Sequence, residues 1–157
     1  MGRAAERVAA LVRIATGSLF LAGAYSKITG EFVRGGFASQ ATKIAAKSWP
    51  VWSRFLHSIV IPGAPAVAWL VAAGELAVGV GLLFGLWARA AALGGVLLVL
   101  TFLLGQSYVP GGSWADWVTA GLTSKFAILL LLLLATVDAG RVWGLDGRSR
   151  RRKPARE

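Results

Sequence analysis

The sequence predicts an all-α integral membrane protein, a bundle of four membrane-spanning helices with an interfacial amphipathic helix between the first two spans. Hydrophobic residues make up 56% of the 157 residues, and the mean hydropathy is +0.65. A soluble domain of this size has too much surface for its volume to bury so many apolar side chains. The charged residues, 15% of the chain, cluster between long apolar segments, a pattern typical of membrane proteins.

The first apolar segment, residues 5–28, has the length of a membrane span, although Arg13 interrupts it. It ends in Ala22-Gly23-Ala24, which also resembles a signal-peptidase cleavage site. A cleaved signal peptide is disfavoured, because Arg13 would split its apolar region and the apolar run continues to Tyr25. Residues 5–28 are therefore predicted to remain as the first span.

Residues 29–64 are too polar to span a membrane and are predicted to form an outer interfacial segment. Ser48 is a candidate N-cap and Pro50 suits the first turn of a helix that follows it. Its predicted apolar face consists of Trp52, Phe55, Leu56 and Ile59. Such an amphipathic helix lies in the interface plane, and Trp49 and Trp52 suit the headgroup boundary.

Two further apolar segments, residues 66–86 and 88–107, follow each other so closely that they must form a tight antiparallel hairpin. Each has about the 20 residues that a bilayer requires. Glycines in the first of them let neighbouring helices approach closely, and Glu75 lies near its middle. A linker rich in glycine and tryptophan, residues 108–123, then leads to the fourth predicted span, residues 124–142.

The distribution of basic residues predicts the topology. Residues 1–147 form one membrane domain, and residues 148–157 form a strongly basic tail predicted to be disordered. Four spans place both termini and the hairpin turn on one side, which carries eleven of the 17 lysines and arginines, against six on the other. By the positive-inside rule, both termini are cytoplasmic, in the inner (cytoplasmic) membrane of a cell.

Composition also restricts the chemistry. The net charge of +10 lies beside apolar segments, so anionic lipid headgroups are the expected partner and nucleic acid is not. The chain has no cysteine and one histidine, His57, which excludes disulfides, thiolate catalysis, iron–sulfur ligation and a bis-histidine haem site within the chain. Neither a metal site nor a covalently bound cofactor is predicted.

Glu75 is the strongest candidate for a functional residue, because an ionised carboxylate in hydrocarbon must be protonated or paired with a cation. Arg13 and Lys27 in the first span are both candidate partners. In the functional interpretation, Glu75 relays a proton and one of these cations binds an anion or a polar headgroup. In the structural interpretation, which has equal weight, a buried ion pair fixes the packing of the two spans.

Three stretches of the sequence resemble the DoxX/DoxD family of membrane proteins. The first is the spacing of Arg13, Gly17, Phe20, Gly23 and Lys27 in the first span. The others are Gly74-Glu75-Leu76-Ala77-Val78-Gly79 with the following Gly85-Leu86-Trp87-Ala88-Arg89, and the closing Ala139-Gly140-Arg141-Val142-Trp143-Gly144-Leu145-Asp146. The Trp-Pro-x-Trp-x-x-Phe-Leu stretch at positions 49–56 is similar to the DoxD type.

The resemblance implies a four-helix membrane bundle with characteristic positions at Arg13, Lys27, Glu75 and Arg89. The DoxD type is a subunit of a thiosulfate:quinone oxidoreductase, so a quinone is the implied ligand. Its pocket would lie near Glu75 and Arg13 or Lys27, with Trp49 and Trp52 at the mouth.

Three functions are consistent with the sequence. A quinone-linked oxidoreductase subunit is the assignment that the resemblance favours. A non-catalytic structural or accessory subunit of a larger membrane complex is the alternative that the absence of redox ligands favours. A small transporter with Glu75 as a proton site ranks last, since the sequence shows no internal repeat.

Overall fold

The computed structural model describes residues 3–137, 140 and 143–146. Three of its helices are long and apolar enough to cross a membrane: α1 (Arg3–Thr29), α4 (Ala64–Phe84) and α5 (Ala88–Gln106). A shorter apolar helix, α7 (Leu122–Thr136), packs along α5. The predicted all-helical membrane bundle is thereby confirmed as the fold class, with no strand in the described ranges.

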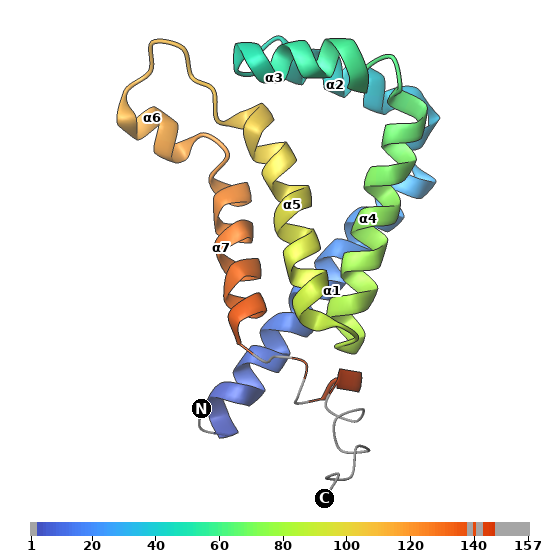
Figure 1. Cartoon of the computed structure of the whole chain (residues 1–157), viewed down its shortest axis with the longest axis vertical. Coiled ribbons are helices and arrows are strands. Elements are labelled where there is room, and N and C mark those ends of the chain that lie inside the picture. Colours follow the sequence, from blue (N-terminus) through green and yellow to red (C-terminus); the bar gives the residue numbers. More distant parts are fainter. Residues whose placement is uncertain (1–2, 138–139, 141–142, 147–157) are drawn as a thin grey trace, which may run out of the picture.

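Short helices join these long ones at one end of the bundle. The segment between α1 and α4 forms η1 (Phe32–Gly36), α2 (Phe37–Ala45), α3 (Pro50–Phe55) and η2 (Leu56–Val60). Helix α6 (Trp114–Thr119) joins α5 to α7. In Figure 1, α2 and α3 lie across the end of α4 and α5, while the start of α1, the α4–α5 turn and the end of α7 lie at the opposite end.

Glycines on α1 and α4 let the two helix backbones meet. A Cβ atom added to Gly17 would lie 2.6 Å from the backbone nitrogen of Leu83 and 3.0 Å from the carbonyl oxygen of Gly79. A Cβ atom on Gly79 would in turn lie 2.9 Å from the backbone nitrogen of Leu21. In lipid, no hydrophobic effect drives helices together. Small residues promote their association instead, because they let the two backbones approach closely.

This close approach predicts a large difference between two glycine-to-alanine changes. Gly17→Ala is expected to lower the free energy of unfolding by about 1–3 kcal/mol, because the new methyl group clashes with the α4 backbone, which cannot move aside as a flexible side chain would. Gly94→Ala is the control, since its Cβ meets only Val78 at 3.8 Å and alanine favours a helix by up to about 1 kcal/mol. Detergent-solubilised variants would be compared by denaturant titration followed by circular dichroism, and equal stability of the two would contradict the proposed crossing.

The interfacial segment differs from the sequence prediction in its N-cap residue. Trp49, not Ser48, precedes α3 as its N-cap residue, because the Ser48 hydroxyl donates instead to the carbonyl of Ile44 at 2.6 Å. Of the side chains on the predicted apolar face, Leu56 is buried within the protein, whereas Phe55 and Ile59 are 39% and 59% exposed. The Ile61 amide donates to the Leu56 carbonyl, five residues back, at 2.8 Å. Such a wide turn rotates Ile59 away from the face that Leu56 occupies.

The fourth predicted span, residues 124–142, is shorter in the structure. Helix α7 ends at Thr136, and Val137 has extended backbone. The leucine run ends at Leu134, and the β-branched pair that follows Ala135 has low helix propensity. Fifteen residues rise about 22 Å, less than the roughly 30 Å of the hydrocarbon core. Residues 138–139 and 141–142 at the end of the predicted span, and the tail 148–157, lie outside the described residues.

The α4–α5 hairpin turn is as tight as predicted. Helix α4 ends at Phe84, Gly85 adopts the left-handed conformation with φ 61°, and α5 begins at Ala88. Glycine is favoured there because the left-handed region carries no Cβ penalty for it. Trp87 is also left-handed, with φ 49°, a conformation that costs free energy in a non-glycine residue and needs support from its surroundings.

Candidate functional site

Glu75 pairs with Lys27 inside the bundle. The Lys27 ammonium donates to both carboxylate oxygens, at 2.8 Å to Oε1 and 2.7 Å to Oε2. The exposed fraction of the Glu75 side chain is 8% and that of Lys27 is 21%, so the carboxylate is the more deeply placed partner. The structure thus resolves the choice between two candidate cations in favour of Lys27.

An aromatic ring and a glycine lie next to the Lys27–Glu75 ion pair. The Lys27 ammonium lies 5.5 Å from the centroid of the Phe32 ring, close enough for a cation–π interaction. A Cβ atom on Gly23 would lie 3.3 Å from Glu75 Oε2 and 3.8 Å from Lys27 Nζ, so the absence of a side chain at Gly23 leaves room for the pair. The pair is therefore enclosed by α1, η1 and α4.

A cavity of about 300 Å³, here called the Glu75 cavity, reaches this carboxylate. Four helices supply its mainly apolar lining, which consists of Thr16, Leu19, Phe20, Gly23, Glu75, Leu98, Val99, Phe102, Thr123, Ser124, Ala127, Leu130 and Leu131. Leu19 on α1 is 73% exposed and Thr123 on α7 is also exposed, so the cavity reaches the surface between these two helices. In a bundle surrounded by lipid, that surface faces acyl chains.

Arg13 lies at a different place from Glu75. Its fully buried guanidinium donates from Nη1 to the Leu82 carbonyl at 2.8 Å and from Nη2 to the Trp143 carbonyl at 3.2 Å. Leu82 is seven residues beyond Glu75 on α4, which corresponds to about 10 Å of helix rise. Arg13 therefore satisfies carbonyls at the C-terminal end of α4, where a cation is favourable, and does not line the Glu75 cavity.

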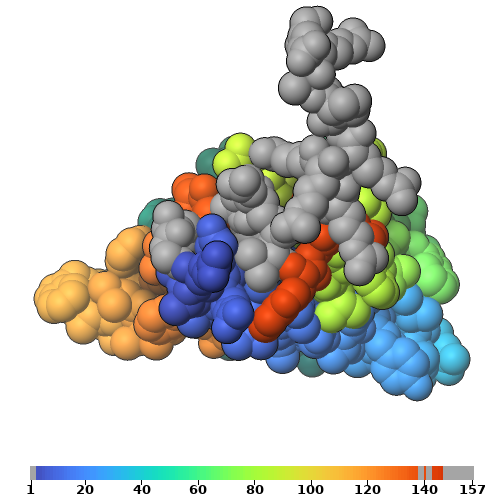
Figure 2. All heavy atoms as spheres, turned by 90° about the horizontal axis from the view of Figure 1, so that it is seen from below, coloured from blue at the N-terminus to red at the C-terminus, as the bar shows by residue number. Residues whose placement is uncertain are grey.

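Asp146 is a residue that the sequence interpretation did not single out. Its carboxylate accepts hydrogen bonds from the backbone amides of Trp87 at 2.9 Å and Ala88 at 3.0 Å, at the start of α5. These bonds support the left-handed Trp87 and place a negative charge at a helix N-terminus, where it is favourable. In Figure 2 the segment 143–146 lies against the α4–α5 turn and beside the first turns of α1. The only signal in the sequence was the position of Asp146 in the stretch that carries the family resemblance.

Trp49 and Trp52 lie in the layer formed by α2 and α3, and neither lines the Glu75 cavity. The Trp49 indole donates to the Ser107 hydroxyl at 3.4 Å, and its ring packs on Tyr108 with centroids 4.8 Å apart. Trp52 stacks on Phe55 at 4.9 Å. The five predicted site residues are thus distributed over three places: the Glu75–Lys27 pair, the Arg13 cluster and this aromatic layer.

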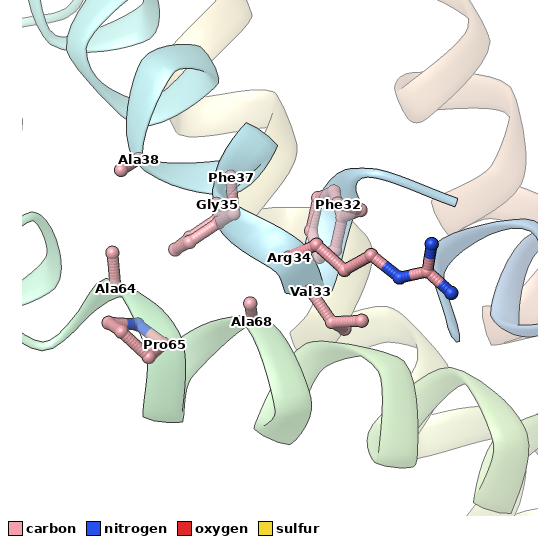
Figure 3. Close-up of a pocket in the computed structure, with 9 residues that line it drawn as sticks. All are labelled: Phe32, Val33, Arg34, Gly35, Phe37, Ala38, Ala64, Pro65 and Ala68. Carbon is pink, nitrogen blue, oxygen red and sulfur yellow. The ribbon is translucent and has the colours of Figure 1, made fainter. Parts of the chain in front are cut away.

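Two other cavities lie near the α2–α3 layer. The first, about 660 Å³, is here called the lysine cavity and is lined by Lys43, Ile44, Ala46, Lys47, Gly105, Gln106, Tyr108 and Gly121. Gln106 of this cavity accepts a 3.5 Å hydrogen bond from Ser124, which lines the Glu75 cavity. The second, about 240 Å³, lies between η1, α2 and the start of α4. Its walls are apolar, and the Arg34 guanidinium extends away from Ala64 and Pro65 in Figure 3.

An all-helical bundle with three long apolar helices and an ion pair buried between two of them defines a multi-helix membrane protein. The family model for DoxX matches residues 8–106, which include most of α1, the α2–α3 layer, α4 and α5, and the chain therefore belongs to the DoxX family. Arg13, Lys27 and Glu75 lie within the matched region, whereas α7 and Asp146 lie beyond it. No curated protein and no solved structure showed a significant match to the chain.

Proposed function

We propose that this DoxX-family protein is a quinone-binding membrane subunit and that the Glu75 cavity holds the quinone ring. The observation that carries the proposal is a buried carboxylate, paired with the Lys27 ammonium, that lines a mainly apolar cavity reaching the lipid-facing surface. Ligand pockets occupy about 300–1,000 Å³, so a cavity of 300 Å³ suits one substituted ring and leaves an isoprenoid tail in the bilayer.

The pair supplies the polar groups that a quinone requires. Reduction of a quinone to a quinol consumes two electrons and two protons. Glu75 lines the cavity and Lys27 does not, so the Glu75 carboxyl group is the one placed to exchange a proton with a quinone oxygen, while Lys27 pairs with it from outside the cavity. Glu75 would pass protons from the partly exposed Lys27 side towards that oxygen, and thiosulfate would supply the electrons in a thiosulfate:quinone oxidoreductase. Since the chain has no cysteine and one histidine, electrons come either directly from the substrate or from a partner subunit.

A pair of pocket variants tests binding. Ala127→Phe projects a ring into the Glu75 cavity and is expected to weaken binding of decylubiquinone about tenfold or more, because the added ring occupies the space of the quinone. Ala73→Phe places the same ring on the exposed face of α4 and is the control. Equilibrium dialysis of the detergent-solubilised protein measures both. Equal affinity in the two variants would exclude this cavity as the quinone site.

Thiosulfate-dependent reduction of decylubiquinone then tests catalysis, with Glu75→Gln as the variant that keeps shape and removes the ionisable group. Loss of reduction with binding retained supports proton relay by Glu75, and full activity in Glu75→Gln would reject that role. Quinone binding without reduction by the isolated chain would favour the second function, an accessory subunit that needs a partner to deliver electrons. Mass spectrometry of a mild-detergent preparation would then identify co-purifying chains and bound quinone together.

A further inference from the structure

The lysine cavity is rich in hydrogen-bond donors and contains no acid. Lys43 lies in the last turn of α2, Lys47 lies two residues beyond the end of that helix, and both are exposed. Neither ammonium has a hydrogen bond or an ion pair within the part of the chain that the structure describes, in contrast to Lys27 and Lys125. Two unpaired positive charges thus border one cavity of about 660 Å³.

Other donors line the same cavity. Gln106 accepts from Ser124 through Oε1, which leaves its amide N–H groups unused among the described residues. The Tyr108 ring packs at a tilt against Trp49, and its hydroxyl has no hydrogen-bond partner among residues 3–137, 140 and 143–146. Gly121 precedes α7, which starts without a side-chain cap, so the positive end of that helix dipole lies at the cavity edge.

We propose that the lysine cavity binds a phosphate-type oxyanion. Lysine ammonium groups, an amide, a phenol and an uncapped helix N-terminus are all donors, and an oxyanion presents only acceptors. The cavity lies where α5 ends, beside Trp49 and Tyr108, and such aromatic side chains mark the level of lipid headgroups. Two kinds of molecule present such an oxyanion at the level of the lipid headgroups: an anionic lipid, through its phosphodiester, and a free oxyanion in the adjacent water.

The experiment uses short-chain probes with the full chain in a neutral detergent. Dioctanoyl phosphatidylglycerol is the lipid probe, dioctanoylglycerol is the same lipid without phosphate, and inorganic phosphate is the free oxyanion. Calorimetric titration gives the dissociation constant of each. The variant is Lys43→Gln with Lys47→Gln, and the control is Arg34→Gln with Arg54→Gln, which removes the same charge from exposed residues outside the cavity.

Dioctanoyl phosphatidylglycerol, or phosphate, is expected to bind the wild-type chain, and the lysine pair variant is expected to weaken that binding about tenfold or more. The arginine pair variant retains the wild-type affinity. Displacement of the lipid by millimolar phosphate assigns the site to a free oxyanion, and lipid binding that resists phosphate assigns it to a lipid headgroup. Binding of dioctanoylglycerol as tight as that of the phospholipid, or equal losses in the two pair variants, would overturn the proposal.

Discussion

Lys27→Met is expected to lower the free energy of unfolding by about 3 kcal/mol or more, because it leaves the Glu75 carboxylate buried without its cation. Methionine retains most of the length and apolar stem of lysine, so the change removes mainly the charge. The two hydrogen bonds at 2.7 and 2.8 Å are lost together, and the apolar walls of the Glu75 cavity offer little to replace them. Denaturant titration of the detergent-solubilised variant measures the loss.

The double variant Lys27→Met with Glu75→Leu is the control for this prediction. Replacement of a buried ion pair by apolar residues is often neutral or stabilising, so the double variant is expected to recover most of the lost stability. It also separates fold from function, since it retains the bundle and lacks the Glu75 carboxylate proposed to contact quinone. A Lys27→Met protein as stable as the wild type would show that water or protonation already compensates Glu75.

The sequence predicts that Glu75 needs a cation but not which one, because the choice depends on how α1 and α4 are aligned. Gly17 packs on Gly79, and this antiparallel contact fixes the register of the two helices. Residues that follow Gly17 on α1 then meet residues that precede Gly79 on α4, which brings Lys27 to Glu75. Residues before Gly17 meet the end of α4, which brings Arg13 to Leu82. A pattern of apolar residues within one helix contains no information on that alignment.

Sequence periodicity predicts the membrane helices well and the interfacial layer less well. Long apolar runs identify α1, α4 and α5 because hydrocarbon imposes the same length on every span. The wide turn at η2 departs from 3.6 residues per turn, so a regular helical pattern does not predict which side chains of the layer the protein buries. The role of Asp146 depends on a contact with backbone amides 58 and 59 positions earlier in the chain, which no local rule anticipates.

The second large effect is expected for Arg13→Met, which should lower the free energy of unfolding by about 3–5 kcal/mol. The fully buried guanidinium joins the end of α4 to the Trp143 carbonyl, and each hydrogen bond to a charged group contributes about 1.5–3 kcal/mol. Its removal takes the charged donor from both carbonyls, of which Leu82 keeps only the Gly85 amide at 3.2 Å, and deprives Asp146 of a nearby positive charge. Arg13→Lys is expected to lose about half as much, because one ammonium cannot reach both carbonyls in the fork geometry of arginine.

Arg89→Met is the matched control for this effect. Arg89 lies in the first turn of α5 at the same end of the bundle and also donates to a helix-terminal carbonyl, that of Ala135, at 2.9 Å. Its side chain is exposed, so water replaces the lost donor and the expected loss is about 1 kcal/mol or less. Equal losses in the free energy of unfolding for Arg13→Met and Arg89→Met would contradict the argument that the burial of Arg13 causes its larger effect. If Arg13→Met instead abolished quinone binding while stability was retained, Arg13 would belong to the quinone site and not to the α4 terminus.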